Sequence, residues 1–438
     1  MVIVGKAPMK KFYLLLLFFG CTLTGFAQSY FPPISGNQWD TVSPAQFAIR
    51  QADIDSALAF LARNDTKAFI VLKDGKILHE HYFGTFTRDS AWYWASAGKT
   101  ITAFAVGMAQ NQGQLHIDSP TSNYLGNGWS SLGSSQERQI TVRHQLTMTT
   151  GLEDDVTDDN CDSPACLTYL APPGTRWAYH NAPYTLLHSV VADAVAQGWQ
   201  PYFNQQISAR TGINGIWLNH VLFSKPRAMA RFGLLMLENG IWNGDTLLGD
   251  TTYLNAMIRP SQNINQSYGY LWWLNGQNSF MLPDLQAQIP GALIPQAPAE
   301  MVMGLGKNDQ KLYLLPSRNI VIIRMGNGAG SEVPVVFDRE FWPYLAPILP
   351  TGAQSTSKQE QPSYLQISPN PVKQQSVVQI QLPVGKYNYQ WLNMAGKLVK
   401  TGVFENGQLL SPEQNGLYLL HITELQSGKQ FYSKLVVE

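Results

Sequence analysis

The sequence predicts an α/β chain of the α+β type, with one antiparallel sheet, helical layers and a small second unit made of strands. Residues 68–83 form two apolar runs around an Asp-Gly turn, which is typical of a β-hairpin. A second hairpin is predicted over residues 311–324, and helical patterns lie between the two, including residues 184–196 and 228–237. Hairpins at both ends of a domain indicate a single sheet closed by those ends. The helices would then form a layer over the sheet and a separate subdomain.

Composition divides the 438-residue chain into a large domain and a small one. Residues 350–363 are polar and almost free of apolar side chains, which is typical of an exposed linker. Short alternating apolar runs with Gly and Asn turns fill residues 364–438 and predict a small β-sandwich. The large domain is therefore expected to cover residues 28–349.

The first 27 residues have the pattern of a secretory signal peptide. Lys10 and Lys11 precede the apolar run of residues 12–19, and small residues precede Gln28. The apolar run is short for a membrane span, and no other stretch is long and apolar enough to be one. We therefore expect an exported protein without a transmembrane span once residues 1–27 are removed.

Cysteine and charge content agree with export and exclude some functions. Removal of the signal leaves Cys161 and Cys166, which flank a polar loop, so we expect a disulfide between them. Two cysteines without nearby histidines make a poor zinc site, and the acidic residues 153–159 lack an EF-hand pattern. No metal or other cofactor is predicted, and the acidic run is interpreted as a solvated loop. A net charge of zero and a charged fraction of 14% argue against a nucleic-acid partner.

Ser96 and Lys99 are the strongest candidates for catalytic residues. They stand three residues apart at the start of the apolar stretch 101–110, so a helix would place them on one face. A desolvated lysine with a lowered pKa can activate a serine nucleophile. The same S-x-x-K spacing recurs at Ser355 and Lys358, but no apolar helix follows there. A capping serine and a solvated lysine explain that second match.

A tyrosine motif supplies a third candidate. Tyr179, His180 and Asn181 follow a Pro-Gly turn and precede a predicted helix, which would present the tyrosine to a cleft. Two other Y-x-N matches, at residues 202–204 and 253–255, lack this context. A phenol, whose pKa is ordinarily about 10, can relay protons if a nearby lysine stabilises its phenolate. His180 is interpreted as filling the variable position of the motif.

Taken in order, these motifs resemble the serine β-lactamase-related family. That family includes class C β-lactamases, D-alanyl-D-alanine carboxypeptidases, esterases and 6-aminohexanoate-dimer hydrolases. The resemblance covers residues 53–326 and rests on residues 96–99, 144–152, 173–181, 268–273 and 304–326. It implies a β-lactamase/transpeptidase-like fold and an acyl-enzyme on Ser96. Lys99 and Tyr179 would manage the serine proton, and Asn181 would contact the substrate.

The third family motif departs from its usual form. Family members carry Lys or His, then Ser or Thr, then Gly on the edge strand, whereas this chain has Gly304, Leu305 and Gly306, followed by Lys307. A backbone N–H near Gly306 or Lys307 can still join that of Ser96 in an oxyanion hole, where each donor is worth about 3 kcal/mol. The missing polar side chains shift the expected reaction toward esters or amides.

Three readings of the function remain open from the sequence. A serine hydrolase acting on a small-molecule or short-peptide ester or amide leads. A β-lactamase or peptidoglycan D,D-carboxypeptidase comes second, and a catalytically silent surface binding protein represents another class. Trp92, Trp94, Trp272 and Trp273 either line an apolar acyl pocket or pack in the core.

The C-terminal unit resembles a type IX secretion sorting domain. The similar segments are residues 367–372, 394–399, 415–418 and 434–437. The resemblance implies the type IX machinery as a partner, with passage through the periplasm and across the outer membrane to the medium or the cell surface. A carbohydrate-binding sandwich is the alternative.

Overall fold

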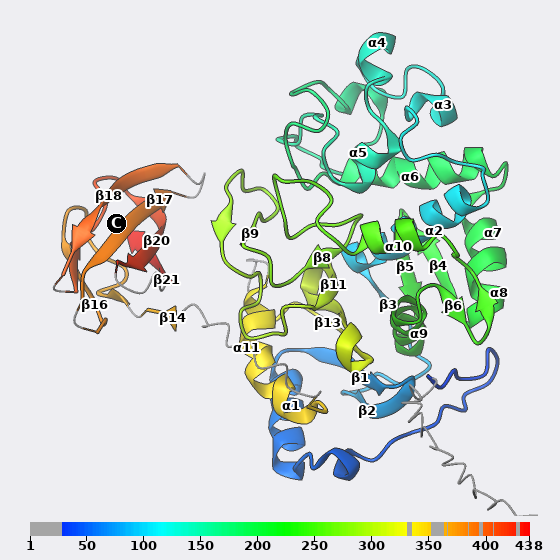
Figure 1. Ribbon diagram of the computed structural model, residues 1–438, viewed down its shortest axis with the longest axis horizontal. Helices are drawn as coiled ribbons and strands as arrows, with labels where there is room; N and C mark the ends of the chain where they lie inside the picture. Colours follow the sequence, from blue (N-terminus) through cyan, green and yellow to red (C-terminus); the bar gives the residue numbers. More distant parts are fainter. Residues whose placement is uncertain are drawn as a thin grey trace, which may run out of the picture.

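The computed structural model describes residues 29–330, 335–351, 363–365, 367–383, 385–393, 397–405, 407–425 and 430–438. The predicted signal peptide, and all but the ends of the predicted linker, lie outside these residues. The described chain combines helices with sheets that are almost entirely antiparallel, which confirms the predicted fold class (Figure 1).

The central sheet joins the two ends of the large domain, as the hairpins predict. Its order is β2-β1-β13-β12-β11-β8, and neighbouring strands run antiparallel. In the middle of the sheet Ile70 of the first hairpin faces Ile323 of the second. The strands are β1 (Thr66–Lys73), β2 (Lys76–Tyr82), β8 (Trp273–Leu274), β11 (Val302–Gly306), β12 (Gln310–Leu315) and β13 (Ile320–Gly326).

Helices cover both faces of this sheet, and every residue of β13 is therefore buried. On one face, Phe69 of β1 packs against Phe341, with ring centroids 5.9 Å apart. On the other, a Cβ at Gly233 would lie 2.4 Å from a methyl carbon of Val321, so glycine lets its helix approach the strands closely. The covering helices are α1 (Gln51–Arg63) and α11 (Val336–Leu345) on the first face and α9 (Pro226–Leu237) on the second.

The remaining helices form the layer and the subdomain that the sequence predicts. Figure 1 shows α3, α4, α5 and α6 grouped at the end of the domain away from β1 and β2. A separate small core there contains Trp129, Ile140 and Leu167. The helices are α2 (Lys99–Asn111), α3 (Ser122–Leu125), α4 (Ser134–Glu137), α5 (Val142–Leu146), α6 (Asn181–Ala194), α7 (Trp199–Phe203), α8 (Ala209–Thr211) and α10 (Thr251–Met257). Short strands are β3 (Trp92–Tyr93), β4 (Gly215–Leu218), β5 (Val221–Ser224), β6 (Ile241–Trp242), β7 (Asp245–Thr246), β9 (Ser279–Phe280) and β10 (Ile289–Pro290).

The C-terminal strands form two sheets around their own core, a small β-sandwich. The larger sheet has the order β14-β21-β20-β17-β18 and the smaller one β15-β16-β19. Trp391 and Leu420 from the larger sheet and Val378 from the smaller one are fully buried together. The strands are β14 (Ser363–Tyr364), β15 (Ile367–Ser368), β16 (Val377–Ile380), β17 (Tyr387–Asn393), β18 (Leu398–Phe404), β19 (Gln408–Leu410), β20 (Gly416–Glu424) and β21 (Gln430–Val437).

Candidate active site

Ser96 lies in a tight turn that leads directly into α2. The turn, Ala95–Gly98, is a short 3-10 helix that continues into the α-helix at Lys99. Trp94 anchors it: the indole Nε1 donates to Ser224 Oγ at 2.7 Å, and the backbone N–H donates to the Leu222 carbonyl at 2.8 Å. Ala95 has a φ of 46°, in the left-handed region that non-glycine residues seldom occupy. Packing around Trp94 thus holds the backbone in a strained conformation just before the serine.

Lys99 lies beneath Ser96, removed from solvent. Its side chain is within hydrogen-bonding distance of two groups, because Nζ is 3.0 Å from Ser96 Oγ and 2.8 Å from Asn181 Oδ1. The rings of Tyr179 and Tyr184 flank the amine at 5.1 and 4.3 Å. Burial lowers the pKa of the Lys99 amine to about 7, while the charge of Asp159 acts in the opposite direction. A neutral amine that can accept the serine proton is therefore well populated at neutral pH.

Tyr179 contacts the same serine but differs in protonation. It stacks on Trp273, with ring centroids 5.9 Å apart. Burial raises the pKa of the Tyr179 phenol, and its hydrogen bond with Ser96 offsets this effect only in part. The phenolate considered from the sequence is thus disfavoured at neutral pH. An amine with a lowered pKa has the properties of a base, and a phenol with a raised pKa has those of a proton donor.

Asn181 is the first residue of α6, and protein groups engage both ends of its side-chain amide. Oδ1 accepts from Lys99, and Nδ2 donates to Asp159 Oδ2 at 2.6 Å. The substrate contact suggested by the resemblance stays a prediction. In the structure, Asn181 instead links the lysine to a surface carboxylate.

Strand β11 brings the third motif to the serine. Glycine at position 306 lets β11 lie close to the turn that holds Ser96. A Cβ there would lie 2.4 Å from the Trp94 carbonyl oxygen and 3.1 Å from the Ala97 nitrogen. A cavity of about 560 Å³ opens between β11 and the turn of Ser96. Its wall includes Ser96, Tyr179, Trp273, Leu282, Pro283, Leu305, Gly306, Lys307 and Asn308. Both residues named for the third motif, Gly306 and Lys307, thus lie at the site.

The four tryptophans left open from the sequence differ in their positions. Trp273 lines the cavity. Trp94 and Trp272 are fully buried core residues, and Trp92 donates to the Gly326 carbonyl at 3.1 Å. Trp272 and Trp273 are neighbours in a strand-like stretch, where successive side chains point to opposite sides. The sequence pattern does not tell which of the two sides faces the cavity.

Gly306→Ala is expected to lower turnover about a hundredfold, because the added methyl pushes β11 away from the turn that holds Ser96. Steady-state kinetics together with thermal melting will separate this effect from unfolding. Gly133→Ala is the matched control: Gly133 has a φ of −67° and nothing within 4 Å of its added Cβ. Near-normal turnover of the Gly306 variant would mean that this approach of β11 is not needed for activity.

The acidic loop contains a site residue that sequence reasoning missed. Asp159 is exposed, yet its carboxylate accepts from Asn181, and its backbone carbonyl accepts from the Ala182 N–H at 2.9 Å. The expected disulfide between Cys161 and Cys166 is present two residues further on, with a Cα–Cα distance of 5.9 Å. Nothing in the sequence distinguishes Asp159 from its acidic neighbours. Over the described residues, no three His, Cys, Asp or Glu side chains gather in a way that could hold a metal.

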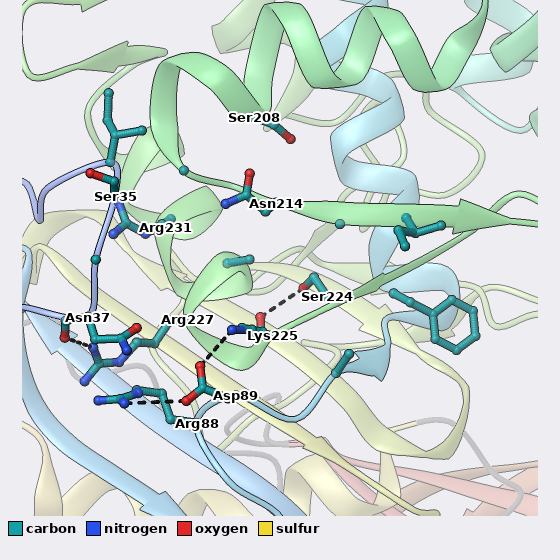
Figure 2. A pocket seen from close by; sticks show the side chains of 18 of the residues that line it. Ser35, Asn37, Arg88, Asp89, Ser208, Asn214, Ser224, Lys225, Arg227 and Arg231 are labelled. Carbon is teal, nitrogen blue, oxygen red and sulfur yellow. Dashed lines mark hydrogen bonds and ion pairs between the residues drawn. The ribbon is translucent and has the colours of Figure 1, made fainter.

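A larger cavity of about 950 Å³ lies elsewhere and carries no catalytic candidate (Figure 2). Three of its basic side chains are engaged by other groups of the protein: Lys225 pairs with Asp89, and Arg227 pairs with Glu80. Arg231 donates to the backbone carbonyls of residues 32, 33 and 211. These contacts clamp the N-terminal segment onto α9. We therefore place the chemistry in the smaller cavity, which holds the serine.

Fold and site together define a serine–lysine protein built on an antiparallel sheet with a helical subdomain. Residues 61–342, more than half of the chain, match the profile of the Beta-lactamase family. The chain belongs to the beta-lactamase family, whose members are usually serine hydrolases. A comparison with curated proteins gave no match.

Solved structures share this fold at low sequence identity. A proposed 6-aminohexanoate-dimer hydrolase from Bacillus anthracis is 18% identical, covers 71% of this chain and 87% of its own, and has a TM-score of 0.54. A penicillin-binding protein homologue from Caulobacter crescentus is 14% identical, covers 72% of this chain and 100% of its own, and has a TM-score of 0.54. A beta-lactamase/D-alanine carboxypeptidase from Pseudomonas syringae is 16% identical, covers 69% and 99%, and has a TM-score of 0.50.

The C-terminal unit is a secretion signal. Residues 366–438 match the secretion system C-terminal sorting domain, which decides against a carbohydrate-binding sandwich and indicates type IX secretion to the exterior or the cell surface. In the part of the chain that the structure describes, no helix has the length and apolar character needed to cross a bilayer.

Proposed function

We propose that this protein is a secreted serine hydrolase that cleaves an ester or amide through an acyl-enzyme on Ser96. One observation carries the proposal: the Lys99 amine lies 3.0 Å from Ser96 Oγ in a site where burial lowers its pKa to about 7. A buried lysine with only a structural role would not need to contact a half-exposed serine in the wall of a cavity.

The chemistry follows from these contacts. Neutral Lys99 takes the Ser96 proton while Oγ attacks the carbonyl carbon of the substrate. We assign the stabilisation of the oxyanion to backbone N–H groups of Ser96 and of Gly306 or Lys307. As the bond to the leaving group breaks, Tyr179 donates a proton to that group and regains one from Lys99. Water then attacks the acyl carbon by the same proton path in reverse, and Ser96 is released.

The cavity wall supports an apolar acyl or leaving group. Trp273, Leu282 and Leu305 line the space beside Ser96, and Gly304 stands where family members carry a cationic residue. One observation favours β-lactams or D-Ala-terminated peptides as the second candidate. Lys307, directly after Gly306, is exposed in the cavity wall and offers a cation to a carboxylate.

A substrate panel tests the proposal. It contains nitrophenyl esters of rising chain length, short amides, a chromogenic cephalosporin and D-Ala-D-Ala peptides, and mass spectrometry locates any trapped acyl group. We expect turnover of esters or amides and an acyl adduct on the peptide that contains Ser96. Turnover of the cephalosporin alone would favour the second candidate. Binding without turnover in every class would favour the catalytically silent surface protein.

Truncation after Pro350 is expected to leave a stable enzyme with near-normal turnover. The C-terminal strands pack around their own buried residues, and Ser96, Lys99 and Tyr179 all belong to the large domain. Steady-state kinetics of the purified truncated and full-length proteins provide the measurement. In a host with type IX export, the truncated protein should accumulate in the periplasm. Loss of activity would make the tail part of the enzyme, and normal surface delivery would contradict its sorting role.

A further inference from the structure

Asp159 is connected to the catalytic lysine, Lys99, by hydrogen bonds through the side chain of Asn181. Its Oδ2 accepts from Asn181 Nδ2 at 2.6 Å, and Asn181 Oδ1 accepts from Lys99 Nζ at 2.8 Å. The other carboxylate oxygen, Oδ1, accepts from Asn160 Nδ2 at 2.6 Å. Two amide groups therefore fix the orientation of a carboxylate that is otherwise at the surface.

The loop that carries Asp159 is fastened at several points. Asp154 forms an ion pair with Arg176, three residues before Tyr179. The Cys161–Cys166 disulfide closes the loop on the other side of Asp159. The Asp159 carbonyl accepts from the N–H of Ala182, in the first turn of α6. Such fastening is unexpected for a solvated acidic loop, whose backbone would gain nothing from being fixed.

The chemistry of the two side chains sets the direction of the Asn181 amide. A carboxylate can only accept hydrogen bonds, so it selects the NH₂ end of the amide and turns the carbonyl oxygen toward Lys99. A neutral lysine amine has two N–H donors and one lone pair. When one N–H is committed to Asn181 Oδ1, the lone pair is free to face Ser96.

We propose that Asp159 is a positioning residue of the active site, which holds Asn181 so that its carbonyl oxygen orients the Lys99 amine toward Ser96. This inference rests on the proposed function. The residue acts through Asn181, and we assign it no contact with the substrate.

The charge of Asp159 adds a measurable consequence. It favours the protonated form of Lys99, against the burial that lowers the pKa of that amine. The other groups that face the amine are Ser96, the Tyr179 and Tyr184 rings, and the imidazole of His188. Burial holds the pKa of His188 well below its usual value and that of both phenols above theirs, so all three are uncharged at neutral pH. Asp159 is thus the carboxylate that acts on the lysine.

The test follows the rate at which a fluorophosphonate labels Ser96 between pH 5 and 9. Asp159→Asn keeps the size of the side chain and removes its charge. We expect the acid limb of the profile to move to lower pH by about half a unit, because Lys99 then loses its proton more readily. Asp159→Ala, which also frees the Asn181 amide, should show the same shift of the acid limb and, above pH 7, label roughly tenfold more slowly. Asp155→Asn removes a charge from the same loop and should leave the profile unchanged.

The outcomes separate this inference from the proposed function. If the wild-type protein is labelled and both Asp159 variants give the same pH profile as the wild type, the positioning role alone would be overturned. Slower labelling without any shift of the acid limb, matched by a proportional loss of folded protein in thermal melting, would also overturn it, because Asp159 would then serve only as a structural cap of α6. Absence of labelling in the wild-type protein would overturn both.

Discussion

Replacing Ser96 with alanine is expected to abolish turnover and labelling by serine-directed phosphonates. Loss of a catalytic serine removes the covalent path and lowers kcat by about 10⁴- to 10⁶-fold in related chemistry. The fold should survive because Ser96 is only half-buried and its hydroxyl contacts Lys99 and Tyr179 rather than the core. The measurements are steady-state kinetics on the best substrate of the panel and intact mass after phosphonate treatment.

Ser355→Ala is the matched control for this experiment. Ser355 has the same spacing to a lysine but belongs to the predicted linker and lies outside the described residues. Its replacement should change neither turnover nor labelling. Labelling that persists in the Ser96 variant would place the nucleophile elsewhere, and the assignment of the site would fall with it.

Replacing Lys99 with methionine is expected to lower the acylation rate about a thousandfold while the protein stays folded. Methionine matches the length of the lysine stem and packs between the rings of Tyr179 and Tyr184. Stopped-flow measurement of acylation gives the rate. The wild-type rate should rise with pH through about 7, where Lys99 loses its proton, and the residual rate of the variant should lack this limb. An unchanged rate would show that another group is the base.

The Lys99→Met variant should also differ from the wild type in how its free energy of unfolding depends on pH. Burial lowers the pKa of Lys99 to about 7 in the folded protein, whereas an exposed lysine has an ordinary value of 10.5. Between these two pH values, the unfolded chain binds a proton at Lys99 that the folded protein does not. The free energy of unfolding of the wild type should therefore rise with pH over this window relative to Lys99→Met. Below pH 7 the difference in free energy of unfolding between the wild type and the variant should stay constant. Denaturant titrations at pH 6, 8 and 10 will measure it.

The sheet and the serine–lysine pair could be predicted from the sequence because their signals are local. An Asp-Gly turn between apolar runs specifies the first hairpin, and the three-residue spacing from Ser96 to Lys99 specifies a shared helix face. The chain ends meet in one sheet as expected, with Ile70 opposite Ile323. Prediction succeeded wherever the interacting residues are near in sequence or belong to a regular element.

The rest of the site depends on contacts that sequence patterns do not encode. Asp159 and Asn181 are separated by 22 positions, and Asp159 comes from an irregular loop. The protonation state of Tyr179 could not be predicted from the sequence either, because the pKa of its phenol depends on how completely the surroundings exclude water. The sequence suggested a phenolate on the basis of a nearby lysine. The structure places that lysine in the same dry environment, where burial lowers the pKa of its amine to about 7 and so weakens the stabilisation that it could give to a phenolate.

The disulfide beside Asp159 ties the assembly of the site to the place where the protein works. Thiols stay reduced in the cytosol and are oxidised after export. A chain still in the cytosol would thus carry Ser96 and Lys99 but lack the Cys161–Cys166 fastening of the loop that we propose orients Asn181. On this view, export completes the enzyme as well as delivering it, and the producing cell is exposed to less hydrolytic activity than its surroundings.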